Sequence, residues 1–209
     1  VVPKDSSVTI SSTVSPTAIA KAGTANFIVN GTADMTTTNM SNGGGAVTIN
    51  GILRTAATDG LRGSGNSTVT TNTVIVNHGS LVDYNAAGNQ NVTGSGVLGG
   101  GTYHAIKFSG SGTKTLTNLA NVHDSVIIAG RLRLGTVTTP GPLMNGVYKL
   151  TGGVVEFANT NSGRQTIRGT ATNAYFNVEV TGTNVGQSSG NINIRNNGSF
   201  TIKSGGILH

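Results

Sequence analysis

The residues that could do chemistry in this 209-residue sequence are few, and its carboxylates come first. Enzymes that cleave polysaccharides gather carboxylates along one groove, for general acid–base work or for binding Ca²⁺. Asp83 and Glu156 stand at matching positions of a repeated phrase, VDY and VEF. If the repeats stack as parallel strands, the two residues lie several strands apart, which is too far for a paired site. We therefore interpret them as outward-facing, solubilising charges. The full set of carboxylates is Asp5, Asp34, Asp59, Asp83, Asp124, Glu156 and Glu179.

The histidines and the glycine-rich stretches do not predict an active site either. His123-Asp124 could serve a serine nucleophile, but no Gly-x-Ser-x-Gly phrase in a strand–turn–helix setting accompanies it. His78 and His104 stand alone, without the spacing of a metal site. GVLGGGTYH, residues 96–104, is not followed by a helical pattern, which argues against a phosphate loop. We predict no catalytic, cofactor-binding or metal-binding residues and no cofactor, and hence no enzyme.

Composition favours a chain of strands and turns. Charged residues make up only 10% of the sequence and hydrophobic residues 35%, whereas 32 residues are glycine and none is cysteine. Polarity comes from Asn, Thr, Ser and Gly, which form strands and turns rather than helices. The net charge of +6 is scattered, apart from the close pairs Arg131/Arg133 and Arg164/Arg168, so nucleic-acid binding is not expected. No apolar run reaches the 18 residues of a membrane span.

A short unit recurs along the chain: two alternating apolar residues, a turn with glycine, then further alternating apolar residues. Alternation gives each strand one buried and one solvated face, and glycine allows a bend at low cost. The first three units begin 20 and then 27 residues apart, which fits the length of one coil of a β-solenoid. The units are FIVNGTADM (27–35), VTINGIL (47–53), VIVNHGSLVDY (74–84), VIIAGRLRL (126–134) and INIRNNGSFTI (192–202).

A longer repeat of roughly 70 residues overlies the short one. GSLVDYNAAGNQNVTG (79–94) matches GGVVEFANTNSGRQTIRG (152–169), and Gln90 matches Gln165. TYHAIKFSG (102–110) then matches AYFNVEVTG (174–182). We predict two higher-order repeats of about three rungs each, at approximately 74–150 and 151–209.

These repeats predict an all-β fold: a right-handed parallel β-helix, or β-solenoid, of roughly nine rungs. Residues 1–209 would form a single β-solenoid segment, which we expect to belong to a longer chain. An antiparallel sandwich stays as the alternative, because the Asn-Gly pairs at 30–31, 50–51 and 197–198 could turn hairpins. We expect the recurring aromatic residues to stack in the core rather than to bind sugar rings on the surface. They are Tyr84, Tyr103, Phe108, Phe157, Tyr175 and Phe176.

Three phrases carry a resemblance to a known group of proteins: GSLVDYNAAGNQNV (79–92), TYHAIKFSGSGTKTL (102–116) and VIIAGRLRLG (126–135). They resemble the repeat regions of large secreted surface proteins of the Bacteroidetes, many of which are exported by type IX secretion. The match covers roughly residues 74–208 and, more loosely, 20–60. It implies an extracellular, adhesin-like or filament-like stalk at the cell surface.

We therefore predict a non-enzymatic structural or adhesive segment of an extracellular bacterial surface protein. Its expected partners are other copies of itself, end to end, and cell-surface or extracellular polysaccharide. One alternative is a β-helix that binds or cleaves carbohydrate, of the lyase or tailspike type. A further alternative is ice binding, suggested by the threonine clusters at 36–40, 68–74 and 136–140, although their irregular spacing argues against a flat array.

Overall fold

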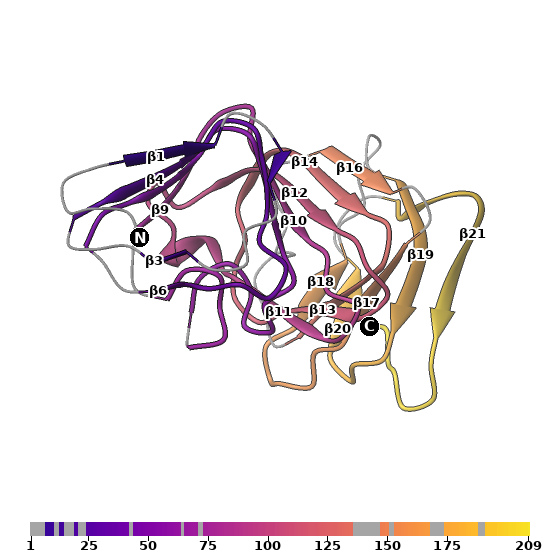
Figure 1. Cartoon of the computed structure of the whole chain (residues 1–209). Coiled ribbons are helices and arrows are strands. Elements are labelled where there is room, and N and C mark those ends of the chain that lie inside the picture. Colours follow the sequence, from indigo (N-terminus) through magenta and orange to yellow (C-terminus); the bar gives the residue numbers. More distant parts are fainter. Residues whose placement is uncertain are drawn as a thin grey trace.

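The computed structural model describes residues 7–10, 13–14, 19–20, 24–41, 44–63, 65–70, 73–135, 147–150, 153–167, 174–187 and 191–209. In these residues the chain is built from short β-strands, with one 3₁₀ turn, η1, at Ser95–Val97. The strands follow one another through the molecule in the order of the sequence, as the colours of Figure 1 show. The threonine cluster at 136–140, part of the cluster at 68–74, Asp5 and Arg168 lie outside the described residues.

Three parallel sheets form the walls of the coil. The first contains β1 (Ser7–Ile10), β4 (Asn26–Val29), β7 (Val47–Ile49) and β9 (Val74–Val76). The second contains β2 (Thr13–Val14), β5 (Thr32–Asp34), β8 (Ile52–Thr55), β10 (Leu81–Tyr84), β12 (Tyr103–Phe108), β14 (Val122–Ile128) and β16 (Val147–Leu150). The third contains β11 (Gln90–Val92), β13 (Thr113–Leu116), β15 (Arg131–Leu134), β17 (Val154–Phe157), β19 (Ala174–Val180) and β21 (Asn193–Ile202). Two smaller parallel pairs are β3 (Ile19–Ala20) with β6 (Met40–Ser41), and β18 (Gln165–Ile167) with β20 (Val185–Gln187).

The predicted parallel β-solenoid is confirmed. Strands one coil apart pair in parallel in all three sheets, so the antiparallel sandwich is wrong. The structure has about six turns instead of the nine expected. Nine turns would leave too few residues for each turn, because some connections between strands are long. Residues 56–73 separate β8 from β9, and part of this segment, including Leu61 and Val69, folds back into the core.

The Asn-Gly pairs at 30–31 and 50–51 form corners between sheets rather than hairpins. The side-chain amide of Asn50 donates to Oδ1 of Asn30 at 2.7 Å, and that of Asn77 donates to Oδ1 of Asn50 at 2.7 Å. This amide ladder links three successive turns in the way that stacked asparagines do. At the same corner a Cβ on Gly51 would collide with the carbonyl oxygen of Gly31, so the turns approach closely because glycine stands there.

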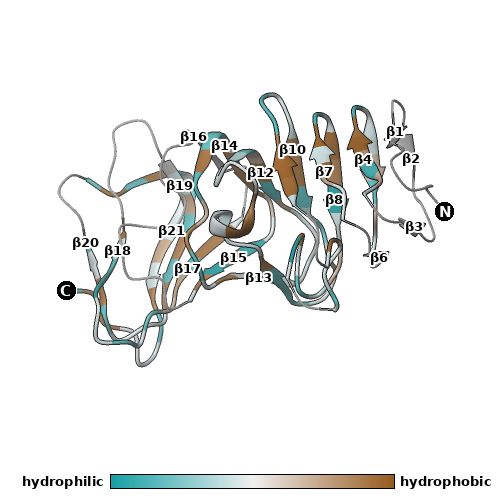
Figure 2. Cartoon of the chain, turned by 90° about the vertical axis from the view of Figure 1, so that its left-hand side faces the viewer, coloured by the Kyte–Doolittle hydropathy of each residue, from teal (hydrophilic) through white to brown (hydrophobic). Residues whose placement is uncertain are grey.

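The core is a continuous apolar stack inside the coil. Figure 2 shows hydrophobic colour on the strands of successive turns. Ile106 and Phe108 point inward as predicted and are fully buried. The rings of Tyr84 and Phe108, on neighbouring turns, have centroids 5.9 Å apart, and those of Phe157 and Tyr175 are 6.3 Å apart. The prediction that the aromatic residues stack in the core is confirmed, with Phe176 packed at its margin.

Candidate functional site

The outer face of the second sheet carries a column of charges of alternating sign. Parallel pairing aligns Asp34 with Arg54, Arg54 with Asp83, and Asp83 with Lys107, one residue from each of four successive strands. Asp34 and Arg54 form an ion pair at 3.7 Å, and Asp83 and Lys107 form one at 3.5 Å. Ser109 also donates to Asp83 at 2.6 Å. The column places opposite charges on adjacent strands, which is favourable for sheet pairing.

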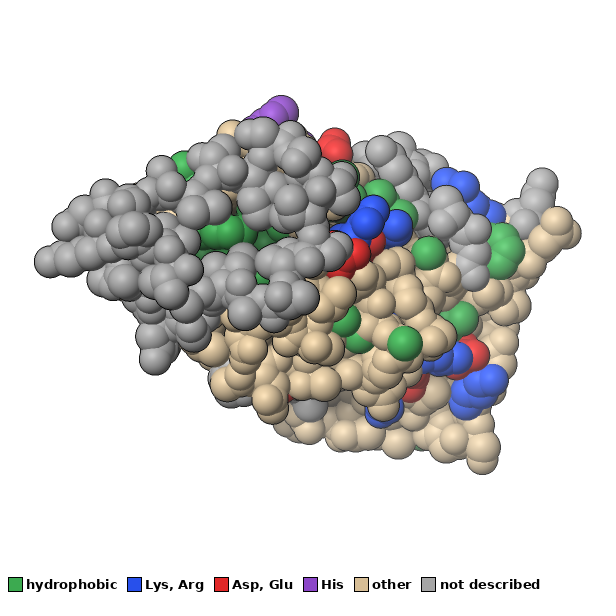
Figure 3. All heavy atoms as spheres, in the orientation of Figure 1, with side chains coloured by type: hydrophobic (Ala, Val, Ile, Leu, Met, Phe, Trp, Pro, Cys, Tyr) green, Lys and Arg blue, Asp and Glu red, His purple; other side chains and the backbone are tan. Residues whose placement is uncertain are grey.

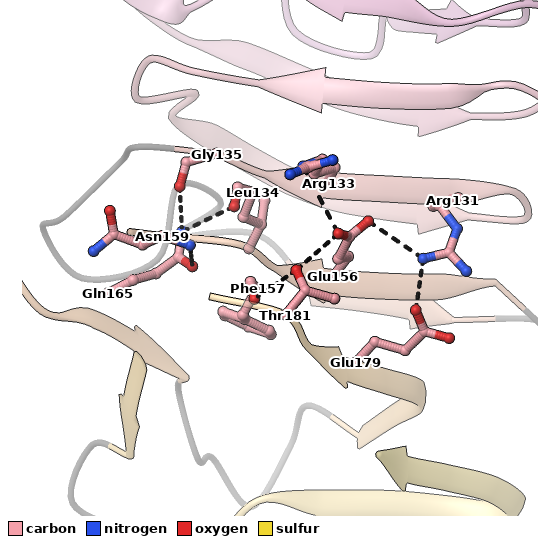
Figure 4. Close-up of polar contacts among 10 residues, drawn as sticks. All are labelled: Arg131, Arg133, Leu134, Gly135, Glu156, Phe157, Asn159, Gln165, Glu179 and Thr181. Atoms are coloured by element: carbon pink, nitrogen blue, oxygen red, sulfur yellow. Dashed lines mark hydrogen bonds and ion pairs between the residues drawn. The ribbon is translucent and has the colours of Figure 1, made fainter. Parts of the chain in front are cut away.

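A denser cluster lies on the third sheet, where β15, β17 and β19 bring together two guanidinium groups and two carboxylates (Figure 4). Nη1 of Arg131 contacts Oε2 of Glu179 at 2.7 Å and Oε2 of Glu156 at 3.3 Å. Nε of Arg133 lies 3.7 Å from Oε1 of Glu156, and the hydroxyl of Thr181 donates to the same oxygen at 2.8 Å. Two carboxylates therefore lie close together on one face, as a glycosidase or lyase requires.

The electrostatics of this cluster favour a structural role. The hydrogen bond from Arg131 and the nearby Lys203 hold the pKa of Glu179 below its ordinary value, whereas the same hydrogen bond raises the pKa of Arg131. A general acid needs a raised carboxyl pKa, the opposite of what Glu179 has. Both carboxylates are also already engaged by cations. The cluster therefore works as an ion-pair network that links neighbouring strands.

The interpretation of Asp83 and Glu156 as solubilising charges is wrong. Alternation does place Asp83 on the outer face, between the inward Val82 and Tyr84. However, Asp83 is only 3% exposed and Glu156 only 7%, because partners on neighbouring strands cover them. The two residues lie on different sheets, Asp83 on the second and Glu156 on the third. The proximity of Glu156 to Glu179 was missed, because only the strand register reveals it.

Buried polar side chains close two corners of the coil, one at the start of the third sheet (Gln90, in β11) and one beyond its end (Gln165, in β18). Nε2 of Gln90 donates to the carbonyl oxygens of Thr55 and Ala57 at 2.8 and 3.0 Å. Nε2 of Gln165 makes the same kind of contact with Leu134 and Gly135, at 3.2 and 3.1 Å (Figure 4). Each glutamine amide is thus a second donor to a carbonyl oxygen that also accepts from the next turn, since Thr55 accepts from the backbone of Asn85 and Leu134 from that of Ala158.

Lys114 takes the position next to Gln90 in the stack, since the two residues pair in register. Its Nζ donates to the carbonyl oxygens of Ala86 and Gly112 at 2.6 and 2.8 Å. The side chain is fully buried, and burial lowers the pKa of Lys114. Sequence reasoning grouped this residue with scattered surface charge. In the structure its buried ammonium group holds two backbone carbonyl oxygens together inside the coil.

An open, mostly polar groove of about 810 Å³ lies beside η1. Asn91, Thr93 and Asn121 line it together with the exposed apolar side chains Val97 and Leu119. Its size would admit a small sugar. The aromatic residues of the core stack are buried, so they offer the groove no platform for stacking on sugar rings.

The structure brings His78, His104 and His123 together, contrary to the expectation that His78 and His104 stand alone. The ring centroids of His78 and His104 are 4.1 Å apart, and those of His104 and His123 are 5.6 Å apart. Asp124 acts electrostatically on His104. In the part of the chain that the structure describes, no serine hydroxyl makes a hydrogen-bond contact with His123 or Asp124. We call these three histidines the histidine triad, a name that refers here only to the cluster of His78, His104 and His123.

The fold defines the chain as a parallel β-solenoid protein. A scan against protein-family models gives no match, and neither the curated proteins nor the solved structures contain one. Among the described residues, no helix is long and apolar enough to cross a membrane.

Proposed function

We propose that this chain is a structural, adhesive or filament-forming segment of an extracellular bacterial surface protein. The observation that supports the proposal most directly is that each turn buries the apolar side chains of the turn before it through parallel strand pairing. Phe200 and Ile202 pair in register with Val178 and Val180, which are fully buried. Phe200 is 37% exposed and Ile202 49% exposed, because no strand covers β21 on its other side in the described residues.

An exposed strand edge with apolar side chains is a template for another strand. In a solenoid each turn contacts only its neighbours, so a further turn would bury these side chains as the preceding turn buries its own. The charge clusters and buried polar clamps then hold turn to turn along the axis. On the face drawn in Figure 3, blue and red side chains form small groups among described atoms that are mostly tan, which suits a passive stalk better than an active site.

End-to-end association of the chain tests this proposal. We expect the purified protein to form longer rods as its concentration rises, measured by analytical ultracentrifugation and negative-stain electron microscopy. Phe200→Asp should abolish this growth, because it places a charge on the apolar edge. Val97→Asp is the matched control, since Val97 is 47% exposed but lies at the groove beside η1.

Rods that do not lengthen with concentration would overturn the assembly part of the proposal, as would equal losses in the two variants. Circular dichroism of both variants shows whether the solenoid is intact. Surface location is tested separately, by binding of an antibody against this segment to intact cells of the source organism. Labelling only after lysis would contradict it.

A further inference from the structure

The histidine triad draws three of the chain's four histidines from neighbouring turns of the coil. His78 follows β9, His104 lies in β12 and His123 lies in β14. His104 is half-buried, whereas His78 and His123 are exposed. The distance between the ring centroids of His78 and His123 is 6.2 Å, so each ring is near both others.

A β-bulge sets the geometry of the triad. The register of β12 with β14 pairs Tyr103 with Val122 and Ala105 with Ser125, so His104 alone opposes His123 and Asp124. A bulge re-aims the side chains beside it and is common next to functional sites. All three histidines line one hollow of about 200 Å³. Figure 3 shows histidine side chains protruding at the upper edge of the molecule.

The spacing of the rings suits metal coordination. Imidazole nitrogens bind Zn²⁺ at about 2.0–2.1 Å with tetrahedral angles, which places the ring centres of two ligands roughly 5 Å apart. The observed spacings of 4.1, 5.6 and 6.2 Å lie around this value. A ligand must also be unprotonated.

We propose that the histidine triad binds a divalent transition-metal ion of the kind that imidazole favours, such as Zn²⁺, Ni²⁺ or Cu²⁺. As the side chains stand, no group of three or more His, Cys, Asp or Glu among the described residues is arranged to hold a metal ion. Binding therefore requires the rings to turn toward the hollow, which exposed side chains such as His78 and His123 can do without disturbing the core. Asp124 supplies a neighbouring negative charge that offsets the ion. The ion would join three turns at one corner.

Isothermal titration calorimetry with ZnCl₂ tests the proposal on the whole chain, without a polyhistidine tag, at pH 7.5. We expect one Zn²⁺ per chain, with affinity at least tenfold weaker in His104→Ala. His209→Ala is the matched control, because His209 is the fourth histidine and lies near Thr183, away from the triad. It should bind as the unchanged protein does. No binding by the unchanged protein, or equal losses in the two variants, would overturn the proposal.

Two further measurements guard against a folding effect at the half-buried His104. His78→Ala and His123→Ala alter exposed side chains and should each weaken Zn²⁺ binding while leaving the thermal melt unchanged. Lowering the pH to 5.5 should also weaken binding, since protons compete for the imidazoles. With Cu²⁺, electron paramagnetic resonance should show nitrogen couplings from several imidazoles. Couplings from a single imidazole, or pH-independent binding, would count against the triad.

Discussion

At the scale of the residue, several charged side chains join one turn to the next. Glu179 shows this most clearly, because it receives Arg131 at 2.7 Å and Lys203 at 3.4 Å. These partners hold its pKa below the ordinary value of 4.5. A carboxyl whose pKa is lower in the folded state binds fewer protons there than in the unfolded state. Its contribution to stability is therefore present above pH 4.5 and is lost as the pH falls through the folded pKa.

We accordingly expect Glu179→Gln to flatten the acid side of the stability–pH profile. Urea unfolding at a series of pH values between about 2 and 7 measures this. The variant should be less stable than the unchanged chain near neutrality, and the two should converge below the folded pKa. Asp59→Asn, which alters a carboxylate outside the ion-pair cluster, serves as the control. Equal slopes for Glu179→Gln and the unchanged protein would show that the ion pairs contribute nothing.

At the scale of the element, the corners decide how closely the turns approach. A Cβ at Gly112 would collide with the backbone carbonyl of Gly88, one turn earlier, whereas a Cβ at Gly88 would meet open space. We expect Gly112→Ala to destabilise the fold by about 1–3 kcal/mol, the usual cost of overpacking. Gly88→Ala should change stability by less than about 0.5 kcal/mol. Chemical denaturation of the two variants compares them, and similar losses would contradict the corner geometry.

The strands were predictable from the sequence, whereas the contacts between turns were not. Alternation identified the inward Ile106 and Phe108, and the recurrence of the units identified parallel stacking. The equivalence of Gln90 and Gln165 was visible as a repeat, although its reason, a clamp on corner carbonyls, appeared only in three dimensions. The histidine triad joins residues 19 to 45 positions apart through strand register and a bulge. Sequence spacing alone does not fix such a register, because connections like residues 56–73 vary in length.

At the scale of the whole molecule, stability should vary along the axis. Each turn is held by its two neighbours, so strands in the middle have two paired edges, whereas among the described residues β21 pairs with β19 alone. We expect amide hydrogen exchange to be slowest in β12 and fastest among the paired strands in β21. Mass spectrometry of peptides covering Tyr103–Phe108 and Asn193–Ile202 measures both. Uniform exchange across the two would instead indicate a single all-or-none opening.

The asparagine corner gives this coil a direction. The side-chain amides of Asn77 and Asn50 each donate to the asparagine of the turn before, Asn50 and Asn30, so their small dipoles point the same way along the axis. The two faces at which turns can be added are therefore chemically different, and copies that met like face to like face would set donors against donors or acceptors against acceptors. A filament built from this unit should be polar, growing head to tail with distinguishable ends.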